Sequence, residues 1–214
     1  MQAFVGFIHS GTDFFVTDAG LVGSETTIGD FFPFDKNGVP EFSRMRTAAQ
    51  YALSIDEWCK IMEKDNNGGY ANSWLIGDVN TNEIARLELG LKYSSLEKKK
   101  DGFFTGSNIT EDLRILRFET KLHETDIKGS DVARRVRWNT LMKEYAGMIN
   151  LELAEKSRQI ILILILIRNS RTPGLYVHIS ILMKNYPVHF FHLPQMVPLM
   201  GKFLIQRWQN RCHL

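Results

Sequence analysis

The stretch from Asn66 to Asn108 reads NNGGYANSWLIGDVNTNEIARLELGLKYSSLEKKKDGFFTGSN. Tyr70–Gly77 and Glu83–Leu91 are rich in apolar and β-branched residues, and the polar segment between them has hairpin-turn chemistry. Phe103–Gly106 is a further short strand candidate, and Asn108 closes the stretch where that strand stops. The stretch therefore predicts an antiparallel sheet with an asparagine presented at one strand end.

Side chains alternate along the second of these strands. One face carries Ile84, Arg86 and Glu88, and the other carries Ala85, Leu87 and Leu89. This pattern predicts a sheet with one packed face and one polar or functional face. The Lys98–Lys100 cluster falls at a predicted hairpin tip, where a solvated turn is favoured over contact with phosphate.

Two short β-type segments precede the sheet stretch. Asp13–Thr17 and Leu21–Thr27 flank an Asp-Ala-Gly turn and predict a hairpin. Phe31–Val39 is an aromatic loop, which either lines a pocket or is pinned to the core by its rings.

Two helices are predicted between this loop and the sheet. After Pro40 the apolar period changes to three and four residues, through a stripe of Phe42, Met45, Ala48, Ala49 and Ala52. Ser54 and Glu57 form a capping box for the second helix. Cys59 lies beside the apolar stripe of that helix, so we expect a packed thiol and not a catalytic one.

A further helix is predicted over Asp131–Tyr145, with Ser130 as N-cap and Gly147 as its end. Its expected inward residues are Val132, Val136, Leu141 and Met142. Arg134, Arg135 and Arg137 oppose the helix macrodipole and need partners. These arginines either form surface ion pairs with Asp126, Asp131 or Glu119, or belong to a site.

Length and composition limit the function. The chain has 214 residues, a formal net charge of +2 and two cysteines. This suits one domain and argues against nucleic acid as a partner. No disulfide framework, metal site or cofactor is indicated, and neither a signal peptide nor a transmembrane span is predicted.

The character of the sequence changes after Lys156. Ile160–Ile167 is an unbroken run of Ile and Leu that is too short to span a bilayer and typical of an aggregation-prone strand. Lipid association through this run is possible, but we expect aggregation. We therefore divide the chain into residues 1–156 and a tail of residues 157–214, which we expect to be poorly ordered or aggregation-prone.

Five blocks carry a resemblance to a known family. They are HSGTDFFVTDAGLVGSETTIG, PEFSRMRTAAQYALSIDEW, NNGGYANSWLIGDVNTNEIARLELGLK, DGFFTGSN and ARRVRWNTLMKE. Together they resemble the N-terminal-nucleophile hydrolases related to acyl-CoA:6-aminopenicillanic-acid acyltransferase and to the phospholipase-B-like proteins. The resemblance covers roughly residues 8–156. With suitable codons, the tail read in another frame resembles the downstream segment of this family, which suggests a frameshift near Ser157.

The resemblance implies an α+β fold, a four-layer αββα sandwich with antiparallel sheets. It implies a cysteine freed as an N-terminal residue, whose thiolate attacks an amide or lipid ester carbonyl. In relatives this cysteine lies upstream of HSGTDFF, and neither Cys59 nor Cys212 matches it. We therefore expect a partial domain that is inactive alone; the alternative is a non-catalytic subunit that pairs with a nucleophile-bearing chain. Relatives are often exported or lysosomal, but this chain gives no compartment.

Four residues take supporting roles by the same resemblance. Asn108 matches a strand-end oxyanion donor, and Arg134 matches a helix-borne arginine that orients the surroundings of the nucleophile. Thr26 falls at a polar position of the oxyanion region, and Asn72 lies on the strand that faces the nucleophile. Alternatively, Asn108 only caps the following turn and Asn72 only bonds neighbouring backbone.

Overall fold

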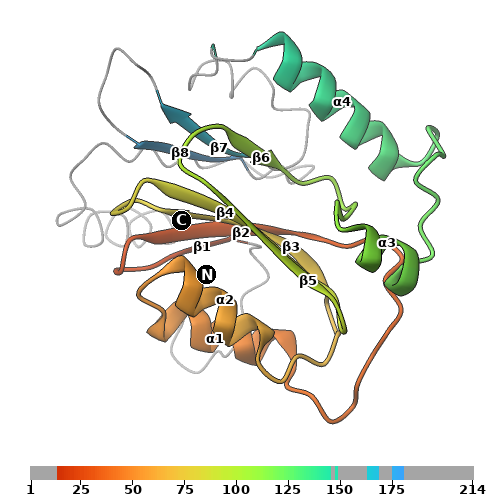
Figure 1. Ribbon diagram of the computed structural model, residues 1–214, viewed down its shortest axis with the longest axis horizontal. Coiled ribbons are helices and arrows are strands. Elements are labelled where there is room, and N and C mark those ends of the chain that lie inside the picture. Colours follow the sequence, from red (N-terminus) through yellow and green to blue (C-terminus); the bar gives the residue numbers. More distant parts are fainter. Residues whose placement is uncertain (1–13, 146–147, 149–162, 169–174, 181–214) are drawn as a thin grey trace, which may run out of the picture.

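The protein has an α+β fold built around a five-stranded antiparallel sheet (Figure 1). The computed structural model describes residues 14–145, 148, 163–168 and 175–180. The sheet has the order β1-β2-β3-β4-β5, so neighbours in sequence are neighbours in space. Its strands are β1 (Phe14–Val16), β2 (Leu21–Thr27), β3 (Asn72–Asp78), β4 (Glu83–Leu89) and β5 (Ser94–Lys99). The predicted hairpins β1–β2 and β3–β4 are confirmed.

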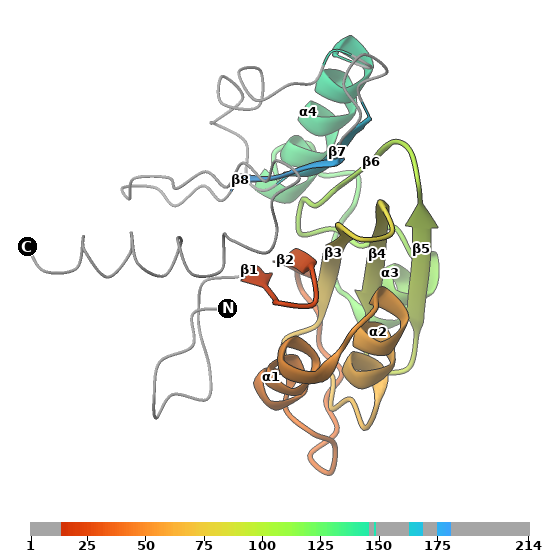
Figure 2. The same cartoon turned by 90° about the vertical axis from the view of Figure 1, so that its left-hand side faces the viewer.

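Two helices cover one face of this sheet (Figure 2). They are α1 (Glu41–Tyr51) and α2 (Ile55–Glu63). The main core lies between them and the sheet, where the Trp58 ring stacks on Phe15 at 5.3 Å and meets the edge of Trp74 at 5.0 Å. The apolar period predicted these helices correctly, although Phe42 is 37% exposed.

The predicted capping box starts α2. The Ser54 hydroxyl accepts a hydrogen bond from the Glu57 backbone N–H at 3.2 Å. The Glu57 carboxylate in turn accepts from the backbone N–H of Leu53 at 2.9 Å. The reciprocal bond therefore goes to the residue before the N-cap, and it still satisfies a backbone donor near the helix start.

The aromatic loop and the lysine cluster differ in how firmly they are held. Phe31 packs against a small core cluster, whereas Phe32 and Phe34 are exposed, so one ring holds the loop. Lys98 belongs to β5 and pairs with Asp56 at 2.8 Å and with Glu83 at 3.3 Å. The cluster is thus partly a paired strand segment and not only a solvated turn.

The second face of the sheet carries polar side chains, as the alternation predicted, but it is buried. Ile84 is fully buried and Glu88 is 2% exposed. The Glu88 carboxylate accepts from the Ser73 hydroxyl at 3.0 Å and from the backbone N–H groups of Glu111 and Asp112 at 2.8 and 2.7 Å. Alternation identified the face correctly, but it could not show that the loop before α3 (Leu113–Glu119) would cover it.

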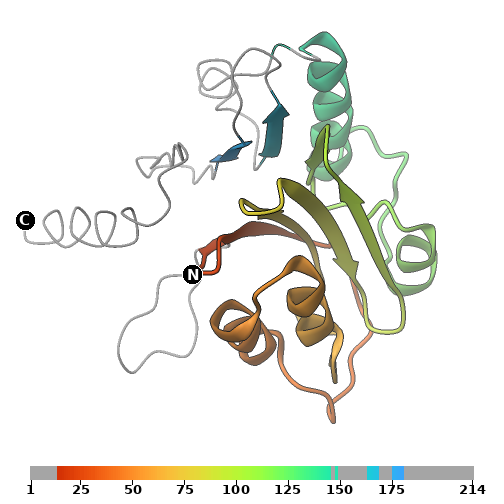
Figure 3. The ribbon, with the colours of Figure 1, turned by 60° about the vertical axis from the view of Figure 1, so that its left-hand side comes forward.

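A second sheet lies beside this face (Figure 3). It has the order β6-β7-β8, formed by Phe103–Thr105, Ile163–Arg168 and Leu175–Ser180. All its pairings are antiparallel, and β7 contacts β3. The described part of the Ile and Leu run is therefore a strand, and Leu175–Ser180 of the tail is another; the other tail residues lie outside the described ranges.

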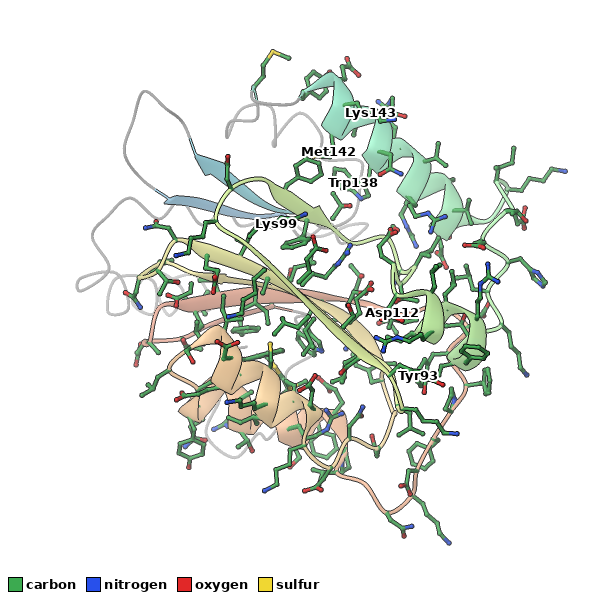
Figure 4. The ribbon with its side chains drawn as sticks, in the orientation of Figure 1. Tyr93, Lys99, Asp112, Trp138, Met142 and Lys143 are labelled. Carbon is green, nitrogen blue, oxygen red and sulfur yellow. The ribbon has the colours of Figure 1, made fainter. Side chains whose placement is uncertain are left out.

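Helix α4 (Ser130–Glu144) differs from the prediction at its start and in its inward face. Gly129 is the N-cap residue and Ser130 is the first helical residue, so Ser130 makes no side-chain cap. Val136 is 53% exposed, whereas Trp138 is buried and points with Met142 toward β6 (Figure 4). The expected stop at Gly147 lies outside the described residues.

No helix in the described ranges is long and apolar enough to cross a membrane.

Replacing Glu88 tests how strongly this carboxylate holds the two layers. We expect Glu88→Gln to lower the free energy of unfolding by roughly 2–3 kcal/mol, because an amide N–H₂ would face backbone N–H donors in a buried place. The exposed Glu97→Gln is the matched control and should change it by less than about 0.5 kcal/mol. Equal effects in urea denaturation would contradict the special role of Glu88.

Candidate active site

Asn108 lies where the chain leaves β6 and passes the end of β2. Its backbone has φ +64°, a left-handed conformation that asparagine tolerates better than most residues. Its side-chain amide N–H donates to the Thr27 backbone carbonyl at 2.7 Å, and its backbone carbonyl accepts from the Gly29 N–H at 2.8 Å. Asn108 is therefore fixed to the β2 end by both backbone and side chain.

Arg134 reaches the same residue from α4. Its guanidinium donates to the Asn108 side-chain oxygen at 2.7 Å and pairs with the Asp131 carboxylate one turn earlier. Asp131 also accepts from the Ser130 hydroxyl at 3.0 Å. Of the acidic partners considered, Arg134 therefore uses Asp131, and it also contacts the predicted site residue Asn108.

These contacts orient the Asn108 amide. Its oxygen faces a guanidinium and its nitrogen faces a carbonyl, so the placement of oxygen and nitrogen satisfies both partners. The nitrogen carries two N–H groups, and the Thr27 carbonyl takes one of them. Among the described residues the second N–H makes no hydrogen bond, so it can donate to a ligand.

Thr26 is next to Thr27, whose carbonyl binds the Asn108 amide. The Thr26 side chain lies on the face of the sheet away from α1 and α2. Its hydroxyl is buried and has no hydrogen-bond partner among the described residues. A Cβ at Gly106 would come within 2.5 Å of the Thr26 methyl group. Only glycine at position 106 therefore lets β6 approach Thr26 this closely.

Asn72 points to the other side of the sheet. Asn72 pairs with Leu89, whose side chain belongs to the main core. The next residue, Ser73, pairs with Thr26, and successive residues of a strand point to opposite faces. With its nitrogen turned toward Glu25, Asn72 donates to that carboxylate at 2.7 Å and to the Ala71 carbonyl at 2.9 Å. The structure thus brings Asn108 and Arg134 together, and it places Asn72 on the opposite face from Thr26.

One acidic residue of this region, Glu25, was missed in the sequence, whereas Asp131 was among the predicted partners. Glu25 is 6% exposed and accepts from the Tyr70 hydroxyl at 3.1 Å as well as from Asn72. Asp131 orients Arg134. A carboxylate inside a strand predicted to lie in the sheet was a usable signal, because such a group needs partners when it is buried.

Cys59 is packed, as predicted. It is 3% exposed in the core between α2 and the sheet. Burial, followed by the nearby Glu63 and Asp56 carboxylates, raises the pKa of the Cys59 thiol to about 12. A thiol that stays protonated at neutral pH is a poor nucleophile. No cluster of His, Cys, Asp and Glu that could hold a metal ion occurs among the described residues.

Comparison with known proteins gives the family. The model of the family described as Phospholipase B matches residues 1–115. The chain belongs to the phospholipase B family. This confirms the phospholipase-B-like part of the resemblance and supports relationship to a family of lipid hydrolases.

Individual relatives match over limited lengths. A putative phospholipase B-like 2 of Bos taurus is 38% identical over 83 residues, which are 36% of this chain and 14% of that protein. Phospholipase B-like protein C of Dictyostelium discoideum is 36% identical over 86 residues, which are 37% of this chain and 15% of that protein. Phospholipase B of Crotalus adamanteus is 30% identical over 132 residues, which are 53% of this chain and 24% of that protein. The chain thus spans a quarter or less of these relatives.

The free energy of unfolding of Asn108 variants tests the contact between Asn108 and Arg134. We expect Asn108→Gly to lower the free energy of unfolding by roughly 1–2 kcal/mol through lost hydrogen bonds. Asn108→Ala should cost about 1 kcal/mol more, because alanine disfavours the left-handed backbone.

A double-mutant cycle of Asn108→Ala with Arg134→Met isolates the pair. It should give a coupling energy of about 1 kcal/mol, and the same cycle with the exposed Arg137→Met should give none. Equal coupling in both cycles would contradict the orienting contact.

The thiol of Cys59 should resist alkylation. In a Cys212→Ser background at pH 8, we expect iodoacetamide to react at least about 100-fold more slowly with the native protein than with the urea-unfolded one, because the thiolate is scarce and buried. Rates follow from mass spectrometry of quenched samples. Fast labelling of the native protein would contradict a packed, protonated Cys59 thiol.

Proposed function

We propose that the described residues form the oxyanion-binding side of an acyl-hydrolase site in an N-terminal-nucleophile fold. The observation that carries this is the Asn108 amide, which Arg134 and the Thr27 carbonyl hold with one N–H left to donate. In this proposal α1 with α2, the two sheets and α4 are the four layers of the sandwich. The order of these elements, from α1 with α2 through the two sheets to α4, supports it (Figure 1).

Each group then has a chemical role. An attacking thiolate converts the substrate carbonyl to a tetrahedral oxyanion, and the remaining Asn108 N–H donates to it. One such fixed donor is worth about 3 kcal/mol of activation barrier in well-studied enzymes. Arg134 makes the amide rigid, and Asp131 fixes Arg134 in turn. We propose Thr26 as a second polar group of the region and give Asn72 a supporting role from the far face.

The nucleophile must come from elsewhere. The buried, protonated state of Cys59 makes it unsuitable. We propose that a cysteine block of the kind seen in relatives supplies the thiolate, and that the chain has no turnover without it. The alternative is a non-catalytic subunit that pairs with a nucleophile-bearing chain, and the same N–H of Asn108 would then complete the joint site.

The substrate is proposed to be an acyl amide or a lipid ester. The names of the relatives support the lipid ester, since they are phospholipase B proteins. We also propose that the family domain ends near Lys156 and that the reading frame changes near Ser157. The family match within residues 1–115 and the abrupt Ile and Leu run support this division. Sequencing across the locus tests it, and an uninterrupted frame in close relatives would refute it.

Turnover tests the site. We expect no hydrolysis of fluorogenic acyl amides or phospholipid esters by the purified chain. Adding a chain that carries the N-terminal cysteine block of a phospholipase B relative should restore it. Restored activity should fall by about 100-fold in Asn108→Ala, because one oxyanion donor is lost.

Cys59→Ala is the matched control and should keep the restored activity, since its thiol takes no part. Activity of the chain alone that needs Asn108 would refute the claim of inactivity. Restored activity that is indifferent to Asn108 would refute the oxyanion role.

A further inference from the structure

An exposed patch of aromatic, aliphatic and basic side chains surrounds α3, which we call the α3 patch. Its apolar members are Phe32, Leu113 and Phe118, which are 53%, 60% and 64% exposed. Its basic members are Arg114, Arg117 and Lys121, which are also exposed. Large apolar side chains rarely gather on a free surface without a binding partner.

Contacts in the structure place these residues side by side. The Phe32 N–H donates to the carbonyl of Glu119 at 3.1 Å, and the Lys121 ammonium lies 5.6 Å from the Phe32 ring centre. Along α3, the ring centres of Phe118 and Tyr93 are 6.0 Å apart, and the Arg114 guanidinium lies 5.5 Å from the centre of the Tyr93 ring. The loop after β2, α3 and the turn before β5 thus share one surface.

The charge of the patch is positive. The Glu119 carboxylate is buried and accepts the backbone N–H groups of Leu91 and Lys92, so it does not neutralise the surface. The Asp112 carboxylate is occupied by Arg114 at 2.6 Å. Exposed Asp30 lies beside Lys121, because its backbone carbonyl accepts from the Lys121 N–H at 3.0 Å, and Glu111 is also exposed. With Arg114 and Asp112 paired, the exposed Lys92, Arg117 and Lys121 outnumber these two acidic residues.

We propose that the α3 patch docks onto an anionic lipid surface. Aromatic and aliphatic side chains can enter the boundary between headgroups and acyl chains, while arginine and lysine at the rim attract negatively charged headgroups. Exposed rings with basic side chains among them favour an anionic membrane over a partner protein, because membrane binding draws on both apolar insertion and attraction to headgroups. This docking does not depend on the proposed catalysis, because binding is measured without turnover.

Vesicle flotation of the full chain tests the docking. The chain should float with vesicles of phosphatidylcholine mixed with phosphatidylserine, and the floating fraction should fall with added salt. Arg117→Gln with Lys121→Gln should lower the partition coefficient by about twenty-fold. Phe32→Ser with Phe118→Ser should lower it by at least about ten-fold.

Matched controls exclude general effects. Lys60→Gln with Lys143→Gln removes two exposed lysines elsewhere, and Tyr51→Ser with Leu53→Ser removes two apolar side chains exposed at 64% and 72%. Both should float like the parent. Aggregates of the tail do not float, so aggregation is separated from binding.

Three outcomes would overturn the docking: no flotation, equal flotation with pure phosphatidylcholine, or equal flotation of patch and control variants. The docking would also be refuted if deletion of residues 157–214 abolished flotation while the patch variants kept it, because the tail would then bind the lipid.

Discussion

The buried carboxylate of Glu88 is the interaction on which the functional surface depends. It projects from β4 into a covered face and accepts the backbone N–H groups of Glu111 and Asp112. A buried carboxylate is stable only when its oxygens are satisfied, so the chain after Asn108 has little freedom to move. This contact fixes where Asn108 lies on one side and where α3 begins on the other.

The helix start extends that constraint. The Asp112 side chain accepts from the backbone N–H groups of Arg114 and Ile115 at 2.8 and 3.2 Å, which caps α3. The hydrogen bond from Arg114, the largest cause, and those backbone bonds lower the pKa of Asp112 below its usual range. A carboxylate with a depressed pKa contributes stability above its unfolded-state pKa and loses that contribution as the pH falls through the folded one. The cap is therefore fully charged at neutral pH.

The sequence allowed much of the fold to be predicted, since the period of apolar residues separates the β1–β2 hairpin, α1 and α2 from the β3–β4 pair. It could not show what covers each face. The alternation put Glu88 on a polar or functional face, but it reports sides and not layers, so the burial of that face did not follow from it. Asn72 and Thr26 lie on adjacent strands, yet the register places them on opposite faces, which only the paired structure reveals. Residue composition and turn chemistry predicted the strands, and register decided which side chains meet.

The outcome for Asn108 and Arg134 has a different physical basis. They are 26 residues apart, and the sequence carries no period that links them. The resemblance named both, and the structure joins them by one hydrogen bond, made by an Asn108 whose backbone is left-handed. The alternatives for Arg134 were a surface ion pair or a site role, but its guanidinium bonds Asp131 and Asn108 together. An ion pair and a site contact are thus compatible on one side chain.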